Sequence, residues 1–306
     1  MPLLPFLNLI RFGNLLMIFL TQYLVKYFLF EPFRIAVTLD WMGFSLLVIS
    51  MMALAAAGNI INDIHDIHTD SINKPQRQVI GKSISEKTAY NWFFGLNILG
   101  VGIGFYLSNL VGRPSFAALF ILPSVFLYLY ATQLKRTILV GNLVVSIMVA
   151  MIIIMIGIFD LLPAITPANQ TTQKVIFFIL VDYAIFAFLV NLLREIVKDQ
   201  EDVNGDYNAG LHTLPVVLGK NRTNKIIFVL ALLPLAAVVY YIYSYLYENL
   251  WAVLYVHLLI LGPLLYFWVR ILGAKTSKEF RHLSILLKIV LAAGLLSIGL
   301  YRFILL

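Results

Sequence analysis

The sequence predicts an all-α integral membrane protein with nine transmembrane helices, and three observations support this fold class. Hydrophobic residues make up 61% of the 306 residues and charged residues only 12%, with a mean hydropathy of +0.91. Soluble domains carry about a quarter charged residues, so the composition excludes an ordinary water-soluble globule. Nine apolar runs are long enough to cross a bilayer, and basic residues are distributed unevenly among the loops between them.

Each predicted helix is an apolar run of roughly 20 residues, the length that spans the hydrocarbon core. Pro123, Pro234 and Pro263 fall inside such runs, where neighbouring helices can accommodate a kink. We expect residues 1–306 to form a single transmembrane domain. The runs are approximately 13–30, 42–61, 90–111, 115–132, 138–159, 175–196, 226–247, 251–271 and 284–305.

The loops between these runs predict the topology. The second, fourth, sixth and eighth loops hold thirteen Lys and Arg residues, whereas the opposite loops hold three. By the positive-inside rule this bias predicts a cytoplasmic N-terminus. The net charge of +7 is therefore a feature of topology, and no basic stretch interleaves with aromatic residues as a nucleic-acid surface would. Two inside loops, at about 62–89 and 197–225, are long and polar, which indicates a four-helix unit used twice, in helices 1–4 and 5–8.

The first polar cluster follows the second apolar run and reads Asn62-Asp63-Ile64-His65-Asp66-Ile67-His68-Thr69-Asp70. Asn62, Asp66 and Asp70 have i, i+4, i+8 spacing, so a continuing helix places them on one face. His65 and His68 lie on other faces and lack a third nitrogen or sulfur ligand at a recognisable spacing. The chain has no cysteine, so a zinc site is not favoured.

The second polar cluster follows the sixth apolar run and reads Asp199-Gln200-Glu201-Asp202-Val203-Asn204-Gly205-Asp206. Asp199, Asp202 and Asp206 have i, i+3, i+7 spacing, although we expect Gly205 to loosen the last turn. With Glu195 counted, the two clusters hold eight of the fifteen acidic residues. The same helical spacing therefore occurs twice, and the predicted topology places both clusters on one side of the membrane.

Stacked carboxylates repel one another unless a cation lies among them. Oxygen-rich clusters suit Mg²⁺, which binds one or two carboxylates together with substrate phosphates. One alternative is a pair of solvated loops whose acids balance neighbouring lysines. Another is a transporter or cation channel, but its path should place ionisable residues near the middle of several helices. Here the predicted helix centres carry almost no charge, with Asp182 as the main exception.

Four segments of the chain resemble one family. They are Arg11-x-x-Asn14; Asn62-Asp63-x-x-Asp66-x-x-x-Asp70 with Ile72-Asn73-Lys74-Pro75-x-Arg77; Tyr130 with Lys135-Arg136 and Gly141-Asn142; and Arg194-Glu195-Ile196-x-Lys198-Asp199-x-Glu201-Asp202-x-x-Gly205-Asp206 with Thr213-Leu214-Pro215 and Leu218-Gly219. In this order they resemble the motifs of the UbiA superfamily of intramembrane prenyltransferases. The resemblance runs from residue 11 to about residue 220.

This resemblance implies a Mg²⁺-dependent enzyme that binds a polyprenyl diphosphate through both aspartate motifs, within a central cavity open to membrane lipids. An allylic carbocation would then be captured by a lipophilic acceptor. Asp66, Asp70, Asp202 and Asp206 would be the catalytic residues. The metal ligands would be drawn from Asn62, Asp66 and Asp70 for one ion and Asp202 and Asp206 for another, with Asp63 and Asp199 as further ligands or partners of ligands.

The resemblance also nominates basic and polar residues for the substrate. Arg77, Lys135 and Lys198 are candidates for direct diphosphate contacts on the cytoplasmic side, with Arg136 a weaker one. The alternative for each is a basic anchor of the positive-inside type. We expect the wall of the site to include Arg11, Asn14 and Tyr130.

The second motif most resembles the branch that transfers geranylgeranyl to geranylgeranylglyceryl phosphate, forming a diether lipid. The phosphate of that acceptor would need a cationic partner, for which Lys74, Lys82 and Lys220 are candidates. An aromatic acceptor, as in quinone or pigment synthesis, is the alternative, because spacing does not distinguish a hydroxyl from a ring carbon.

Overall fold

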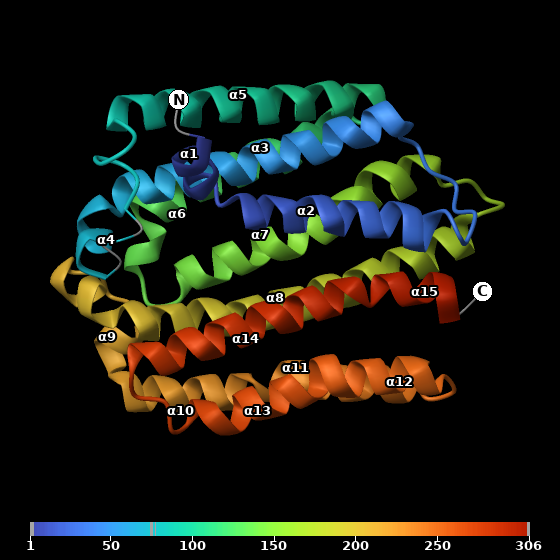
Figure 1. Cartoon of the computed structure of the whole chain (residues 1–306). Helices are drawn as coiled ribbons and strands as arrows, with labels where there is room; N and C mark the ends of the chain where they lie inside the picture. The colour runs from blue at the N-terminus through green and yellow to red at the C-terminus, as the bar shows by residue number, and fades with distance from the viewer. Residues whose placement is uncertain (1–2, 74–75, 77, 305–306) are drawn as a thin grey trace.

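The computed structural model describes residues 3–73, 76 and 78–304. Within this part of the chain every regular element is a helix, and the one strand-like feature is an isolated bridge between Ile80 and Ile84. The helices lie side by side in an elongated bundle, with α4 and α9 at one end and the C-terminus at the other (Figure 1). They are α1 (Leu3–Leu9), α2 (Phe12–Leu24), α3 (Trp41–His65), α4 (Ile67–Asn73), α5 (Glu86–Leu110), α6 (Ala118–Thr132), α7 (Val140–Ile156), α8 (Gln170–Asn208), α9 (Leu214–Leu218), α10 (Lys220–Leu230), α11 (Leu232–Tyr241), α12 (Leu250–Val256), α13 (Gly262–Ile271), α14 (Ser277–Leu296) and α15 (Ile298–Ile304).

Nine helical segments among the described residues are long and apolar enough to cross a membrane, which confirms the predicted number. The segments that follow the even-numbered spans, including α4, α9 and the α6–α7 and α13–α14 connections, lie at the same end of the bundle (Figure 1). The spans are Phe12–Phe30, Trp41–His65, Glu86–Leu110, Pro114–Thr132, Val140–Ala164, Gln170–Asn208, Lys220–Leu246, Leu250–Ile271 and Ser277–Arg302.

Several spans combine an α-helix with a neighbouring turn of different width. Wide π turns continue α2, α7 and α11, and another joins α12 to α13. Pro234 has no amide proton to donate to the carbonyl four residues earlier, and the chain bends at Ala231, between α10 and α11. The remaining short elements are 3₁₀ turns at Pro114–Ala117, Leu134–Arg136 and Leu162–Ala164.

The helix that carries the first polar cluster is interrupted at Asp66. The Asp66 backbone, with φ −97° and ψ 4°, caps α3, and α4 begins at Ile67. Hydrogen bonds from Asp66 N to Asn62 O at 2.9 Å and from Asp70 N to Asp66 O at 2.7 Å cross this break. The expected continuous helix is therefore bent, while the four-residue spacing is kept.

The helix that carries the second polar cluster is longer than its apolar run. α8 continues through Gly205 and ends at Asn208, so the expected loosening at Gly205 does not occur. At 1.5 Å per residue its 39 residues measure about 58 Å, roughly twice the hydrocarbon thickness of a bilayer. Its acidic last turns therefore extend beyond the apolar layer, where water and ions reach them.

Residues before the first predicted span form an additional helix, α1. The chain turns between α1 and α2 at Arg11, whose φ of 53° lies in the left-handed region. Asn59 of α3 donates a hydrogen bond to the Ile10 carbonyl at 3.0 Å and fixes this turn. The turn allows Arg11 to reach α3 from the start of α2.

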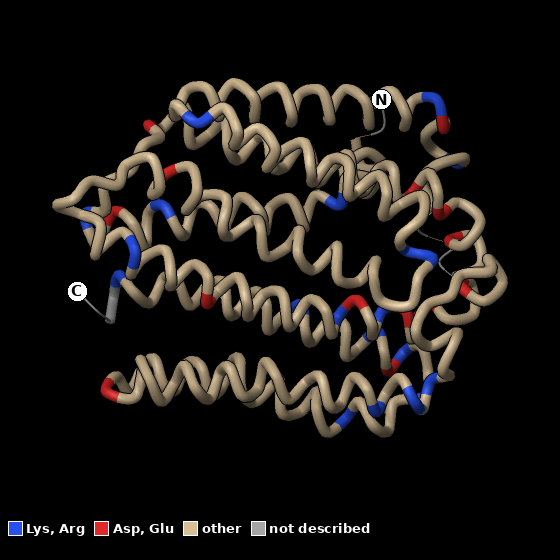
Figure 2. The backbone as a smooth tube through the Cα atoms, turned by 180° about the vertical axis from the view of Figure 1, so that it is seen from behind, with Lys and Arg blue, Asp and Glu red and all other residues tan. Residues whose placement is uncertain are grey.

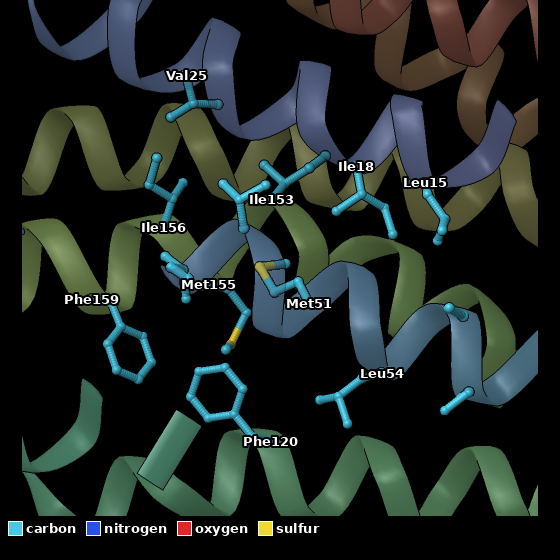
Figure 3. Packing of buried hydrophobic residues seen from close by; sticks show 14 of the residues in the cluster. Leu15, Ile18, Val25, Met51, Leu54, Phe120, Ile153, Met155, Ile156 and Phe159 are labelled. Carbon is cyan, nitrogen blue, oxygen red and sulfur yellow. The ribbon is translucent and has the colours of Figure 1, made fainter. Parts of the chain in front are cut away.

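Buried apolar side chains of α2, α3, α6 and α7 pack together in the N-terminal half of the chain (Figure 3). Figure 3 shows Met51 of α3 between the helices, with Met155 of α7 near Phe120 of α6. The Phe120 ring also lies against Gly104 of α5, where a Cβ atom would come within 2.2 Å of it. A second apolar cluster is formed mainly by α8, α10, α11, α13 and α14.

One buried ion pair holds the bundle together at the end opposite the polar clusters. Lys26 Nζ donates to Asp160 Oδ2 at 2.7 Å and to the Leu39 carbonyl at 2.9 Å, and the Leu39 amide donates to Asp160 Oδ1 at 2.8 Å. The Asp160 side chain is completely buried. The pair joins the first span, the segment before α3 and the turn that follows α7.

We predict that Asp160→Ala lowers the free energy of unfolding by about 3–5 kcal/mol, because it leaves the Lys26 ammonium buried without its counter-ion. Thermal unfolding of the purified protein in detergent measures the loss. Glu31→Ala, at an exposed acid of the same end, is the matched control and should change stability little. Equal unfolding temperatures for the two variants would contradict this role of the pair.

Candidate active site

The two polar clusters face one cavity, because α4 packs against α8. The cavity has a volume of about 1290 Å³ and is lined by side chains from both clusters and from the neighbouring helices. Charged residues gather at the two ends of the bundle and are sparse along its middle, as Figure 2 shows. The predicted site residues that line the cavity are Arg11, Asn14, Asn62, Asp63, Asp66, Asp70, Tyr130, Lys135, Lys198, Asp199, Asp202 and Asp206.

One of the predicted diphosphate contacts within the described residues, Arg136, does not line the cavity. Arg136 is exposed, and its backbone carbonyl accepts a hydrogen bond from the His212 amide at 3.1 Å, which ties the α6–α7 turn to the segment before α9. Arg77 lies outside the described residues. Lys135, directly before Arg136, points into the cavity instead.

The wall formed by α3 and α4 is centred on Asp66. Asn62 Nδ2 donates to Asp66 Oδ2 at 2.7 Å, and the Lys135 ammonium pairs with the other oxygen, Oδ1. Gly141 of α7 allows this approach, because a Cβ atom there would come within 3.0 Å of the Lys135 backbone. A cation and an amide thus hold one carboxylate at the edge of the cavity.

Asp63 on the same wall pairs with the start of α2. Arg11 Nη2 donates to Asp63 Oδ1 at 2.7 Å. Burial lowers the pKa of the Arg11 guanidinium, but the Asp63 carboxylate together with Tyr130 and Asp66 raises it, and the net result is a pKa above its ordinary value. Arg11 therefore stays charged, and Asp63 acts in this structure as its partner.

On the wall formed by α8, Asp199 and Asp206 each accept a hydrogen bond from a neutral donor. Asn142 of α7 donates from Nδ2 to Asp199 Oδ2 at 2.8 Å. The Thr213 hydroxyl donates to Asp206 Oδ2 at 3.2 Å, in a buried contact that folds the chain after α8 back onto its last turns. Asp202 lines the cavity between these two positions.

Deeper along α8, Glu195 accepts from two cations. Lys198 Nζ donates to its two carboxylate oxygens at 3.0 and 2.9 Å, and Arg194 Nη1 donates to Oε1 at 3.1 Å. All three side chains line the cavity. Lys198 is thus paired with Glu195 of its own helix, and it lines the same cavity as the acidic clusters.

The donor atoms of the site fit Mg²⁺. Asn62 Oδ1 is buried and has no hydrogen-bond partner among the described residues, so an amide oxygen beside Asp66 is available as a ligand. No group of three or more His, Cys, Asp or Glu residues in the described chain is close enough to hold a metal by itself. Mg²⁺ binds one or two carboxylates together with several substrate oxygens. Asn62, Asp66 and Asp70 on one wall and Asp202 and Asp206 on the other could hold such ions.

Beyond the carboxylates the cavity becomes apolar. Its lining there includes Ile18 of α2, Leu54 of α3, Phe120 of α6 and Met155 of α7, and these side chains surround the region drawn in Figure 3. An elongated apolar group attached to a phosphate would thus find hydrophobic walls next to an ionic binding surface.

Three residues of the site were not singled out from the sequence as site residues. Arg194 and Glu195 both line the cavity from α8. Their membership of the second motif was the sequence signal that could have identified them as site residues. Lys288 of α14 also lines the cavity. The predicted span began at residue 284, which placed Lys288 near its start. In the structure α14 begins at Ser277, so Lys288 is a charged residue well inside a span.

Similarity to known families and proteins identifies the class of this protein. A model of the UbiA prenyltransferase family matches residues 34–298. The chain belongs to the UbiA prenyltransferase family. It is therefore a prenyltransferase and an integral, multi-pass membrane protein, as the motifs and the nine spans indicated.

Two individual relatives of known name are similar to most of the chain. The chain is 33% identical over 246 residues to the digeranylgeranylglyceryl phosphate synthase of Korarchaeum cryptofilum, covering 78% of this chain and 79% of that protein. It is also 33% identical over 215 residues to the protein of the same name from Methanobrevibacter smithii, covering 70% and 69% of the two chains.

Solved structures share the fold. A structure described for a digeranylgeranylglyceryl phosphate synthase has a TM-score of 0.66 at 23% identity and covers 97% of this chain and 98% of its own. A UbiA homologue from Archaeoglobus fulgidus, bound to GPP and Mg²⁺, has a TM-score of 0.56 at 15% identity, with 96% and 99% covered. At these identities the comparison supports the architecture of this UbiA prenyltransferase.

We predict that Lys135→Met weakens binding of a prenyl diphosphate by about tenfold to a hundredfold, because a charge-assisted contact in the cavity is lost. The adjacent Arg136→Met, which removes an exposed cation outside the cavity lining, is the matched control and should change binding less than about threefold. Binding of radiolabelled prenyl diphosphate to the purified variants in Mg²⁺ measures both. A larger loss of binding in the Arg136 variant than in the Lys135 variant would contradict the assignment of the phosphate contact to Lys135.

Proposed function

We propose that the enzyme transfers a geranylgeranyl group from its diphosphate to geranylgeranylglyceryl phosphate, in a Mg²⁺-dependent reaction that forms a diether lipid. The observation that carries the proposal is the pair of aspartate clusters on opposite walls of one cavity that continues into an apolar region. The acceptor is taken from the two relatives at 33% identity, both named digeranylgeranylglyceryl phosphate synthase.

The donor diphosphate would lie between the two aspartate walls. Asn62, Asp66 and Asp70 would hold one Mg²⁺, and Asp202 and Asp206 the other. When bound, Mg²⁺ neutralises the diphosphate and makes it a better leaving group. The Archaeoglobus fulgidus homologue binds GPP or DMAPP together with Mg²⁺, which supports a metal-dependent donor site in the family.

The basic residues would orient the diphosphate and follow its growing charge. Lys135, which pairs with Asp66, and Lys198, which pairs with Glu195, are both near the carboxylates without being buried completely. Each could exchange part of its present contact for a phosphate oxygen. Fixed cations at the leaving group stabilise the transition state more than the ground state.

The chemical step would break the bond between the allylic carbon of the donor and the diphosphate oxygen. The resulting allylic cation would be captured by the acceptor hydroxyl, whose oxygen forms the ether bond while its proton passes to the released diphosphate. The apolar lining, with Phe120 and Tyr130 among its aromatic members, would exclude water that could otherwise capture the cation. The site would face the cytoplasm, because the loops at this end carry the excess of basic residues.

The direct test supplies radiolabelled geranylgeranyl diphosphate to membranes containing the protein, with geranylgeranylglyceryl phosphate or 4-hydroxybenzoate in parallel. We expect a diether product that requires Mg²⁺ and disappears with EDTA. Asp202→Asn should lower the rate by about a hundredfold or more, because the diphosphate charge is then less well compensated.

A prenylated aromatic acid as the main product would replace the proposed acceptor while leaving the donor chemistry intact. Full product formation in EDTA would contradict the Mg²⁺ requirement. Unchanged turnover in Asp202→Asn would remove the α8 cluster from the proposed site.

A further inference from the structure

Lys288 is a cation in the middle of a membrane-spanning helix, and it has no acidic partner among the described residues. It lies three turns into α14, about 16 Å from Ser277 at 1.5 Å per residue. Its Nζ donates to Asn14 Oδ1 of α2 at 3.2 Å, which is a neutral contact. Ionisable residues at such depth are costly and usually serve a function.

A second cation, Arg194, is carried by the neighbouring helix α8. α8 and α14 pack against each other, and like charges on adjacent helices repel. Both side chains line the cavity. Two cations that repel each other across a cavity wall are stabilised when an anion lies between them.

Arg194 also carries an unused donor. Its Nη1 is bound to Glu195, but its Nε is buried and has no hydrogen-bond partner among the described residues. A buried donor without an acceptor costs free energy that an anionic ligand would recover. The guanidinium fork is suited to phosphate oxygens, which accept two parallel hydrogen bonds.

We propose that Arg194 and Lys288, with Asn14 beside them, form a second anion-binding subsite that takes the phosphate of the acceptor lipid. Arg194 precedes Asp202 by eight residues on α8, which places it about 12 Å deeper than the carboxylate that faces the donor diphosphate. The subsite is therefore separate from the proposed metal ligands. Lys288 is exposed as well as cavity-lining, so it lies where the cavity meets the surface between α2 and α14.

The chemistry of the acceptor requires such a subsite near the reacting carbon. A glycerol has three carbons, so its free hydroxyl is at most two carbons from the carbon that bears the phosphate. When that hydroxyl attacks the donor, the phosphate must lie a few bonds away and needs its own cations. Two of the earlier candidates, Lys82 and Lys220, are not among the lining residues, and Lys220 contacts the Lys275 carbonyl and the Phe280 ring instead. Lys74 lies outside the described residues.

The inference rests on the proposed acceptor, and its test uses two lipids that differ only in the phosphate: geranylgeranylglyceryl phosphate and geranylgeranylglycerol. Lys288→Met should raise the KM for the phosphorylated lipid about tenfold to a hundredfold with little change in kcat at saturation. The KM for the unphosphorylated lipid should be the same in both proteins. Lys288→Arg should restore most of the loss, and Lys278→Met, at an exposed position of the same helix, should behave like the wild type.

Equilibrium binding of the two lipids without Mg²⁺ or donor separates this inference from the proposed function. We expect the wild type to bind the phosphorylated lipid at least tenfold more tightly than the unphosphorylated one, and Lys288→Met to lose that preference while its thermal stability is unchanged or higher. Product formation by the wild type with no change in Lys288→Met would overturn the subsite and leave the proposed function standing. Failure of the wild type to prenylate the phosphorylated lipid would overturn the proposed acceptor, and equal binding of the two lipids would overturn the subsite.

Discussion

The contact between α4 and α8 is the interaction on which the site depends. α4 carries the end of the first acidic cluster, and the last turns of α8 carry the second, Asp199–Asp206. Without this contact the chain would have two solvated acidic helix ends, one after the second span and one after the sixth. With it, carboxylates from segments more than a hundred residues apart line a single cavity.

Bringing so many acids together is possible because each described contact compensates part of their charge. Asp63 has Arg11, Asp66 has Lys135 and Asn62, Asp199 has Asn142, and Glu195 has Lys198 and Arg194. The partners of these carboxylates come from the start of α2, from α3, from the α6–α7 turn, from α7 and from α8 itself. The site therefore depends on the packing of several helices. The same interactions leave Asn62 Oδ1 and Arg194 Nε as buried groups that a ligand can satisfy.

The sequence was sufficient for the number of spans, the family and the acidic residues that line the cavity, but not for its apolar lining. Apolar length and motif spacing are local properties, and both survive folding. The break at Asp66 and the continuation of α8 through Gly205 were not predictable in this way, since neither follows from apolar length or motif spacing. The significance of Lys288 was hidden because a boundary shift of a few residues decides whether a lysine lies at the end of a span or inside it. Lys135 and Arg136 are adjacent cations of one loop, and the fold turns Lys135, the stronger candidate, into the cavity while Arg136 is exposed.

The central claim is that the two aspartate clusters bind one diphosphate together. A double-mutant cycle with Asp66→Asn and Asp202→Asn, read out as Mg²⁺-dependent binding of geranylgeranyl diphosphate, tests it most directly. If both walls hold the same ligand, either substitution alone should remove most of the binding and the double variant should lose little more, a strongly non-additive result. Independent losses that add in free energy, or full binding in one of the single variants, would show that the clusters do not share a ligand.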